Sequence, residues 1–103
     1  MWVPITLKEL LKTISNTEQL LSPELEKFWQ LISIEPVKWM ENEHGNENGG
    51  FWVVAIYGKK AVWYNDIEEG FNVSTYKTFG EIAEYGCEQY ELNQIISQLY
   101  NNY

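Results

Sequence analysis

The sequence contains no arginine and few lysines. Its 15 aspartate and glutamate residues outnumber its 7 basic residues, which gives a formal net charge of -8 at pH 7. Proteins bind nucleic acids and anionic membranes largely through lysine and arginine contacts to phosphate. The composition therefore argues against both as partners. It favours a basic protein partner, because a field of one sign accelerates encounters with the opposite charge, although the same net charge also simply keeps a protein soluble.

Cysteine and histidine are equally scarce, with one residue of each. Cys87 alone cannot form an internal disulfide, so nothing indicates adaptation to an oxidising compartment. One cysteine and His44 do not supply the four ligands of a typical structural zinc site. Residues 1–6 lack the basic and apolar regions of a signal peptide, and the longest apolar run, residues 51–57, is too short to span a bilayer. We therefore expect a cytoplasmic protein without a cofactor or metal.

Apolar and aromatic residues, in contrast, are plentiful. They make up 45% and 16% of the sequence, well above the level of disordered chains. The length of 103 residues is close to the commonest domain size, and no linker, repeat or low-complexity tract divides the chain. We expect residues 1–103 to form a single domain that folds unaided.

Three segments carry apolar residues at the i, i+3, i+4, i+7 spacing of an amphipathic helix. The first begins at Leu7, after a capping box formed by Thr6 and Glu9. The second runs from about Pro23 to Ser33, with Ser22 as its N-cap. The third lies at the C-terminus. The apolar positions are Leu7, Leu10, Leu11 and Ile14; Leu25, Phe28, Trp29 and Ile32; and Leu92, Ile95, Ile96 and Leu99.

The sequence pattern in the middle of the chain predicts antiparallel strands. Residues 51–57 and 61–66 are rich in β-branched and aromatic residues and flank a turn at Gly58, which predicts a hairpin. Residues 37–41 and 71–77 are further strand candidates, and the glycine-rich stretch 42–50 reads as a loop. The predicted fold class is α+β: two N-terminal helices, an antiparallel β-meander of three to four strands, and a C-terminal helix packed on the sheet.

Residues 78–86 have two interpretations. Thr78 and Glu81 form a second capping-box pattern, and Gly86 suits the end of a short helix. Alternatively, Gly80 is a bulge in a continuing strand. The pattern slightly favours the helix.

The strand at residues 51–57 is apolar on both faces. Strict alternation places Trp52, Val54 and Ile56 on one face, and Phe51, Val53, Ala55 and Tyr57 on the other. A strand of this kind is normally covered on both sides. We expect loops and the N-terminal helix to cover the second face; the alternative is an exposed apolar surface that binds a partner or a second copy.

No catalytic motif is present. His44 lies in the glycine-rich loop, where a solvated role is expected, and a buried structural role is expected for Cys87. The run from Asp66 to Glu69 supplies three carboxylates but lacks the spacing of an EF-hand calcium loop. These patterns favour a protein that is not an enzyme.

The favoured function is therefore the binding of a basic protein partner, with carboxylates at the rim of the contact and aromatic side chains as anchors. The candidate contact residues are Glu41, Glu43, Glu47, Trp63, Tyr64, Asp66, Glu68 and Glu69. In size, acidity and aromatic content the chain resembles bacterial immunity proteins, which block cognate nuclease toxins. That resemblance implies an inhibitor of a basic partner and assigns no residue a role.

Two alternatives remain. One is a homodimer with a structural or regulatory role, formed through an apolar sheet face or a strand edge. The other is a small enzyme or ligand-binding domain whose pocket lies between the sheet and the C-terminal helix, with Tyr85, Glu84 or His44 converging on it.

Overall fold

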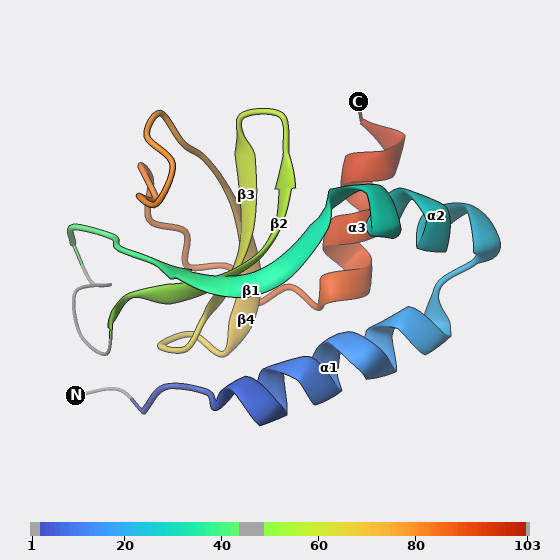
Figure 1. Ribbon diagram of the computed structural model, residues 1–103, viewed down its shortest axis with the longest axis horizontal. Coiled ribbons are helices and arrows are strands. Elements are labelled where there is room, and N and C mark those ends of the chain that lie inside the picture. The colour runs from blue at the N-terminus through green and yellow to red at the C-terminus, as the bar shows by residue number, and fades with distance from the viewer. Residues whose placement is uncertain (1–2, 44–48, 103) are drawn as a thin grey trace.

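The computed structural model describes residues 3–43 and 49–102, which form an α+β fold (Figure 1). Two N-terminal helices precede a four-stranded antiparallel sheet of order β1-β2-β3-β4, and a third helix follows it. The elements in chain order are α1 (Leu7–Leu20), α2 (Pro23–Ile32), β1 (Ser33–Trp39), β2 (Phe51–Tyr57), β3 (Lys60–Asn65), β4 (Gly70–Thr75) and α3 (Leu92–Asn101). In the described part of the chain, none of the helices has the length and apolarity needed to cross a membrane.

The helix starts follow the local signals in the sequence. Thr6 Oγ1 accepts a hydrogen bond from the Glu9 amide, and the Glu9 carboxylate accepts one from the Thr6 amide, each at 3.1 Å. Ser22 caps α2 and Pro23 occupies its first turn. Each cap satisfies backbone N–H groups that have no partner within the helix, so residues close in sequence are sufficient to fix these boundaries.

The first strand starts earlier than the predicted range 37–41. β1 begins at Ser33, directly after α2, and ends at Trp39. Its register against β2 shifts between Ser33 and Val37, an interval that contains Pro36. A proline is tolerated there because β1 is an edge strand.

A bulge in β2 changes which face its side chains occupy. The register against β3 shifts between Val53 and Ala55. As a result Val54 and Ala55 both pack into the core beneath the helices, while Ile56 packs on the opposite side. The face assignment from strict alternation is therefore right through Val54 and wrong from Ala55 onward, because the bulge inserts one residue into the alternation.

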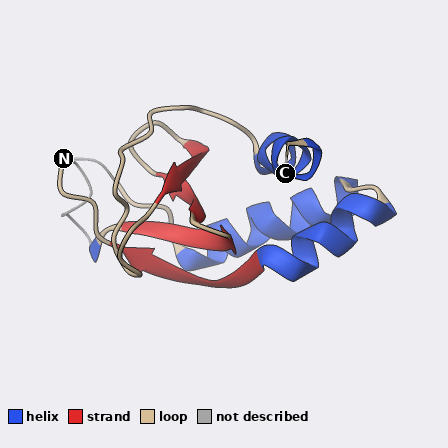
Figure 2. Ribbon diagram, turned by 90° about the horizontal axis from the view of Figure 1, so that it is seen from above, coloured by secondary structure: helices blue, strands red, loops and turns tan. Residues whose placement is uncertain are grey.

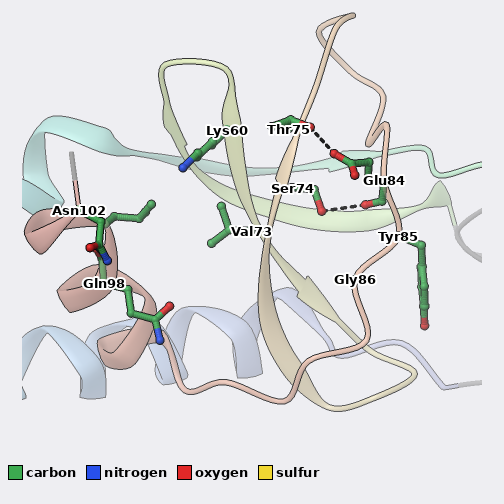
Figure 3. Close-up of a pocket in the computed structure, with 10 residues that line it drawn as sticks. Lys60, Val73, Ser74, Thr75, Glu84, Tyr85, Gly86, Gln98 and Asn102 are labelled. Carbon is green, nitrogen blue, oxygen red and sulfur yellow. Dashed lines mark hydrogen bonds between the residues drawn. The ribbon is translucent and has the colours of Figure 1, made fainter.

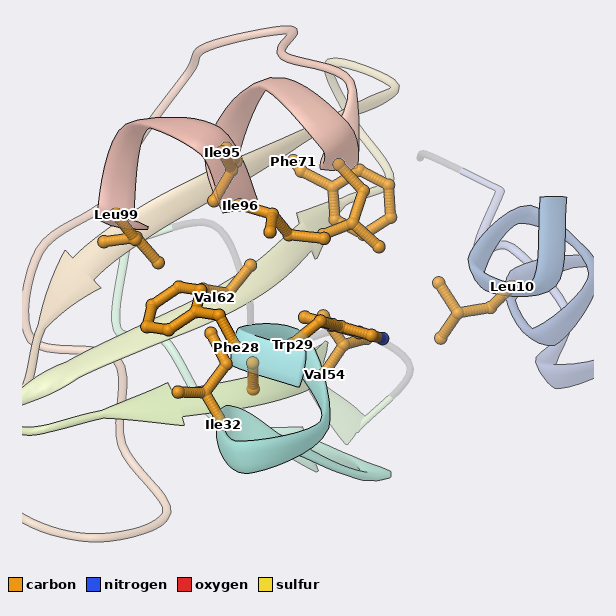
Figure 4. Packing of buried hydrophobic residues seen from close by; sticks show 12 residues of the cluster. Leu10, Phe28, Trp29, Ile32, Val54, Val62, Phe71, Ile95, Ile96 and Leu99 are labelled. Carbon is orange, nitrogen blue, oxygen red and sulfur yellow. The ribbon is translucent and has the colours of Figure 1, made fainter. Parts of the chain in front are cut away.

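One face of the sheet, the helix-covered face, packs against all three helices. α2 and α3 supply most of the helical side chains, and Leu10 of α1 reaches the same core from the side (Figure 4). The buried residues of this core are Leu10, Phe28, Trp29, Ile32, Val54, Ala55, Val62, Phe71, Leu92, Ile95, Ile96 and Leu99.

The opposite face, the loop-covered face, packs against the connection between β4 and α3, residues 76–91. This connection, called the 76–91 segment below, arches over the molecule before α3 begins (Figure 2). The buried residues on this side are Trp39, Phe51, Val53, Ala61, Trp63 and Ile82, with Tyr76 and Tyr85 packed against them. Loops therefore cover the second face as expected, but the N-terminal helix does not.

The region 78–86 is neither the favoured short helix nor a continuing strand. It runs as turns and bends, with a single bridge between Glu81 and Met40 at the end of β1. Met40 donates to the Gly80 carbonyl at 3.1 Å and accepts from the Ile82 amide at 2.8 Å. Ile82 is buried against the sheet, so packing on the loop-covered face overrides the helical spacing in the sequence.

Helix α1 buries less of its apolar stripe than the spacing predicts. Leu10 and Thr17 are buried, whereas Leu7 and Leu11 are 42% and 46% exposed. The buried residues of α1, Leu10 and Thr17, are therefore seven positions apart, and the side of the apolar stripe that carries Leu7 and Leu11 stays at the surface.

Candidate functional site

One end of the molecule gathers carboxylates from three separate parts of the chain. The start of α1 and the β3–β4 turn line one cavity, and the end of β1 lies on the same, left side of the molecule in Figure 1. We call this region the acidic end. The described carboxylates in these three segments are Glu9, Glu41, Glu43, Asp66, Glu68 and Glu69.

A cavity of about 350 Å³ opens between the N-terminal segment and the β3–β4 turn. We call it the Asp66 pocket. Three of its lining residues are carboxylates, a fourth is Tyr64, and lysine is absent from the lining. The lining residues are Val3, Pro4, Ile5, Glu9, Tyr64, Asp66 and Glu69.

Asp66 is the most buried carboxylate of this pocket, with 7% of its surface exposed. Its Oδ2 accepts a hydrogen bond from the Ile5 amide at 2.6 Å, which ties the N-terminal segment to the β3–β4 turn. Its Oδ1 is buried and has no hydrogen-bond partner in the structure. Burial raises the pKa of Asp66, although hydrogen bonds from the backbone amides of Ile5 and of Asp66 itself, and the charge of Lys38, oppose this shift.

The neighbouring groups confirm that negative charge is concentrated here. Burial raises the pKa of the Tyr64 phenol, and the charges of the three pocket carboxylates raise it further. Hydrogen bonds from Thr6 lower the pKa of Glu9, so this exposed carboxylate keeps its charge. Glu69 adopts a left-handed backbone conformation, with φ of 58°, which a non-glycine residue adopts only at an energetic cost.

A second cavity of about 510 Å³ adjoins the Asp66 pocket and shares Tyr64 and Glu69 with it. It runs between α1 and residues 89–93, and we call it the α1 groove. Its lining includes Glu91 and again no lysine. The other lining residues are Thr13, Asn16, Thr17, Leu20, Gly70, Phe71, Gln89, Tyr90, Leu92 and Asn93.

A row of aromatic side chains crosses the sheet beneath these cavities. The register pairs Trp52 with Tyr64 and Tyr64 with Phe71, and a bridge then pairs Phe71 with Tyr90. Tyr64 is half-buried and Tyr90 is 37% exposed. The two cavities therefore combine carboxylates with accessible aromatic surface.

Some of the predicted contact residues lie at the Asp66 pocket, and others lie away from it. Tyr64, Asp66 and Glu69 line the Asp66 pocket, and Glu68 lies beside them in the same turn. Glu43 is exposed at the acidic end. Glu47 lies outside the described residues.

Besides Asp66, two predicted contact residues are buried, and neither of them lines the Asp66 pocket or the α1 groove. Trp63 has no exposed surface, and its indole N–H donates to Ser74 Oγ at 3.0 Å. Glu41 is 3% exposed, and both its carboxylate oxygens accept from the Glu43 amide at 3.1 Å. Glu41 nevertheless contributes to the electrostatic field, because its charge and that of Glu68 raise the pKa of Tyr85, after the larger effect of burial.

A third cavity, of about 410 Å³, lies beside β4 and α3 (Figure 3). The ligand-binding alternative predicts a pocket at this place, between the sheet and the C-terminal helix. Glu84 and Tyr85 line it, but both are engaged with the fold. The Glu84 carboxylate accepts from Thr75 Oγ1, and the Tyr85 hydroxyl accepts from Asn65 Nδ2 at 3.0 Å. Among the described residues of the lining, the other charged side chain is that of Lys60.

The remaining candidates for chemistry are Cys87 and His44. Cys87 is exposed, which corrects the expectation of a buried thiol. His44 lies outside the described residues. No group of three or more histidine, cysteine or carboxylate side chains in the described ranges is arranged to hold a metal ion.

Sequence patterns missed the contribution of the N-terminal segment. Ile5 and Asp66 are separated by 61 positions, so no local spacing indicates their hydrogen bond. Glu9 was assigned to the capping box alone, yet it also forms a wall of the Asp66 pocket. Comparisons of the chain with protein-family models, with curated proteins and with solved structures give no match.

Proposed function

We propose that the protein binds a basic protein partner through its acidic end and is not an enzyme. The observation that carries this proposal is the composition of the two adjoining cavities. Four carboxylates line them, and no lysine does. These carboxylates are Glu9, Asp66, Glu69 and Glu91.

The arrangement suits recognition in two ways. Exposed carboxylates attract a positively charged surface and exclude a negatively charged one, which chiefly affects the rate of encounter. Accessible aromatic side chains supply contact area at low entropic cost, as in many protein interfaces. Tyr64 and Tyr90 lie among the carboxylates and are the aromatic residues placed to anchor such a contact.

An inhibitor of a basic nuclease toxin is the specific version of this proposal. A nuclease binds phosphate through basic residues, and an inhibitor with negative charge is complementary to such a surface. The net charge of -8 and the carboxylates around the Asp66 pocket support this version.

The proposal is tested by neutralising the acidic end. Partners are captured from the native lysate on the immobilised protein, and association rates with the purified partner are measured at low and high salt. Glu68→Gln with Glu69→Gln should slow association about tenfold at low salt, and less at high salt, where charges are screened beyond about 10 Å.

A matched control removes the same charge elsewhere. Glu26→Gln with Glu35→Gln changes two exposed carboxylates, on α2 and β1, outside both cavities. The control should change the rate much less. Equal slowing in both double variants, or capture of acidic proteins only, contradicts the proposal.

A further inference from the structure

Asp66 leaves one oxygen of its carboxylate, Oδ1, buried and without a hydrogen-bond partner in the structure. The backbone amide of Asp66 lies close enough to lower the pKa of the carboxyl group, but it makes no hydrogen bond to Oδ1. The Asp66 side chain lines the Asp66 pocket. A buried acceptor without a partner costs about 1–3 kcal/mol, and more when it is charged. A ligand that brings a donor into this pocket removes that cost, so the pocket is prepared for a hydrogen-bond donor.

The surrounding charges specify what kind of donor fits. Glu9 and Glu69 flank Asp66, so the pocket disfavours any anion and favours a cation. No group of three or more histidine, cysteine or carboxylate side chains in the described ranges could hold a metal ion, so an organic cation is the ligand class that we consider. The charge of Lys38 lowers the pKa of Asp66, but by less than burial raises it. The Lys38 ammonium group lies 5.2 Å from the centroid of the Trp52 ring, and Lys38 does not line the pocket.

The occupied oxygen of Asp66 discriminates between the two cationic side chains. Arginine gains most when its planar guanidinium pairs with both oxygens of one carboxylate. Here Oδ2 already accepts from the Ile5 amide, so only Oδ1 is available. An ammonium group is a compact charge with three rotatable donors, which suits one buried oxygen and the flanking carboxylates.

We infer that the Asp66 pocket receives the ammonium group of a lysine side chain from the partner, which then donates to Asp66 Oδ1. This inference rests on the proposed function and names the residue type that the acidic end recognises. Tyr64 contributes a ring wall along which the aliphatic part of the lysine packs.

Binding in this pocket is coupled to protonation. The groups that face Asp66 are Glu9 on α1, Tyr64 on β3, Glu69 in the turn and Lys38 on β1. Burial makes protonation of Asp66 easier than for an ordinary carboxyl group, whereas an ammonium ligand favours the ionised form. Affinity for a lysine ligand should therefore rise with pH as Asp66 ionises, and binding should release a proton.

The test is an NMR titration of the intact protein with two short capped peptides, Gly-Lys-Gly and Gly-Arg-Gly. The lysine peptide should shift the Ile5 amide and the Asp66 carboxyl resonance in a saturable way, and should lower the pKa of Asp66. The arginine peptide should bind severalfold more weakly. Equal shifts from both peptides contradict the lysine preference.

Matched variants separate the pocket from general attraction to negative charge. Asp66→Asn keeps an acceptor for the Ile5 amide and should weaken lysine binding about tenfold or more. Glu26→Gln removes the same charge from an exposed position of α2 outside both cavities and should have little effect. If Asp66→Asn does not fold, Glu69→Gln, at the exposed wall of the pocket, should also weaken binding severalfold.

The outcomes distinguish this inference from the proposed function. Shifts confined to Glu43 and Glu68, with Ile5 and Asp66 unaffected, mean that basic ligands bind the acidic end without using the pocket; the inference then fails and the proposed function stands. No shift at any carboxylate, even with a lysine oligomer, counts against both.

Discussion

Both faces of the sheet are covered, but by different means. On the helix-covered face, apolar side chains of α2 and α3 pack on the strands. On the loop-covered face, the strands present polar side chains that bond the backbone of the 76–91 segment. Asn65 donates to the Gly86 carbonyl, Ser74 donates to the Glu84 carbonyl, and Asn72 both donates to and accepts from the backbone of Glu88.

The difference follows from what covers each face. A helix satisfies most of its own backbone groups, so a strand beneath it needs to offer only apolar surface. A loop that covers a sheet has unpaired N–H and C=O groups, and those must find partners when they are buried. The buried polar residues of β3 and β4 supply these partners, and Asn65, Asn72 and Ser74 are each at most 6% exposed.

The close approach of this segment also depends on two glycines. A Cβ on Gly70 would lie 2.2 Å from the Gln89 Cα, and one on Gly86 would lie 2.5 Å from Asn72 Oδ1. The contact at Gly70 is with backbone, so this position requires glycine if the segment is to lie against β4. A side chain at Gly86 would displace the Asn72 amide group that bonds the backbone of Glu88.

The largest expected effect comes from removing one buried tryptophan on each face. Trp29 of α2 is buried in the core on the helix-covered face, and its indole N–H donates to the Glu18 carboxylate of α1. Trp63 of β3 is buried on the loop-covered face, and its indole N–H donates to Ser74 Oγ of β4. Trp29→Ala and Trp63→Ala should each lower the free energy of unfolding by about 3–5 kcal/mol, as measured by urea denaturation.

Limited proteolysis should distinguish these two variants. Trp63→Ala should expose the 76–91 segment to cleavage, since that segment packs on the ring of Trp63 through Tyr85. Trp29→Ala should loosen α1, because Trp29 holds Glu18 at the end of that helix. The same cleavage sites in both variants would show that the two faces do not respond separately.

A smaller effect is expected from Asn72→Ala, which tests the hydrogen bonds between the strand side chains and the backbone of the 76–91 segment. Its side chain makes two hydrogen bonds to Glu88, of 2.8 and 2.9 Å, and their loss leaves backbone groups without partners. Stability should fall by about 1–3 kcal/mol, and the Glu88 amide should exchange faster with solvent. Asn101→Ala, at an exposed position of α3, is the control and should change stability by less than about 0.5 kcal/mol.

The pH dependence of stability tests the acidic end. Asp66 belongs neither to the apolar core beneath the helices nor to the polar contacts beneath the 76–91 segment. Its pKa is raised above the ordinary value of 3.8, so the folded state favours the protonated form. The wild type should therefore lose stability, relative to Asp66→Asn, as pH rises from below 3.8 through the raised pKa of the folded state. Denaturation of both proteins between acid and neutral pH measures this difference; a gap that does not depend on pH contradicts the raised pKa.

The smallest effect is expected at Glu69, whose left-handed backbone is in the turn that carries the Asp66 pocket. Glu69→Gly should be more stable than Glu69→Ala by about 1 kcal/mol, because glycine adopts positive φ without the steric cost of a Cβ. Thermal unfolding of the two variants gives the comparison directly, since both lack the carboxylate. Equal melting temperatures would mean that the turn relaxes without cost.

Local patterns predicted much of this fold and only part of the candidate site. The capping box at Thr6 and the apolar spacing of α3 predicted their helices, because these signals act within one or two turns. The acidic run from Asp66 to Glu69 was identified as a contact region from its charge alone. The pocket itself was not predicted, because Ile5 and Glu9 reach Asp66 only when α1 lies against the β3–β4 turn.

The polar alternation of β4 shows why burial was hard to predict. Asn72 and Ser74 alternate with Phe71 and Val73, a pattern typical of a strand with one face in water. The 76–91 segment instead covers that face, and its own helix-like spacing gave no indication of this course. A polar residue in a strand can face either water or the backbone of a covering loop, and sequence alone does not distinguish the two.

The sequence by itself determined the helix starts, the β2–β3 hairpin and the excess of negative charge, because each depends on residues close in the chain or on composition. Only the tertiary structure decided the bulge after Val53, the course of the 76–91 segment and the burial of Asp66 beneath Ile5. These depend on how distant segments fill space and satisfy one another's backbone groups, and no local pattern contains that information.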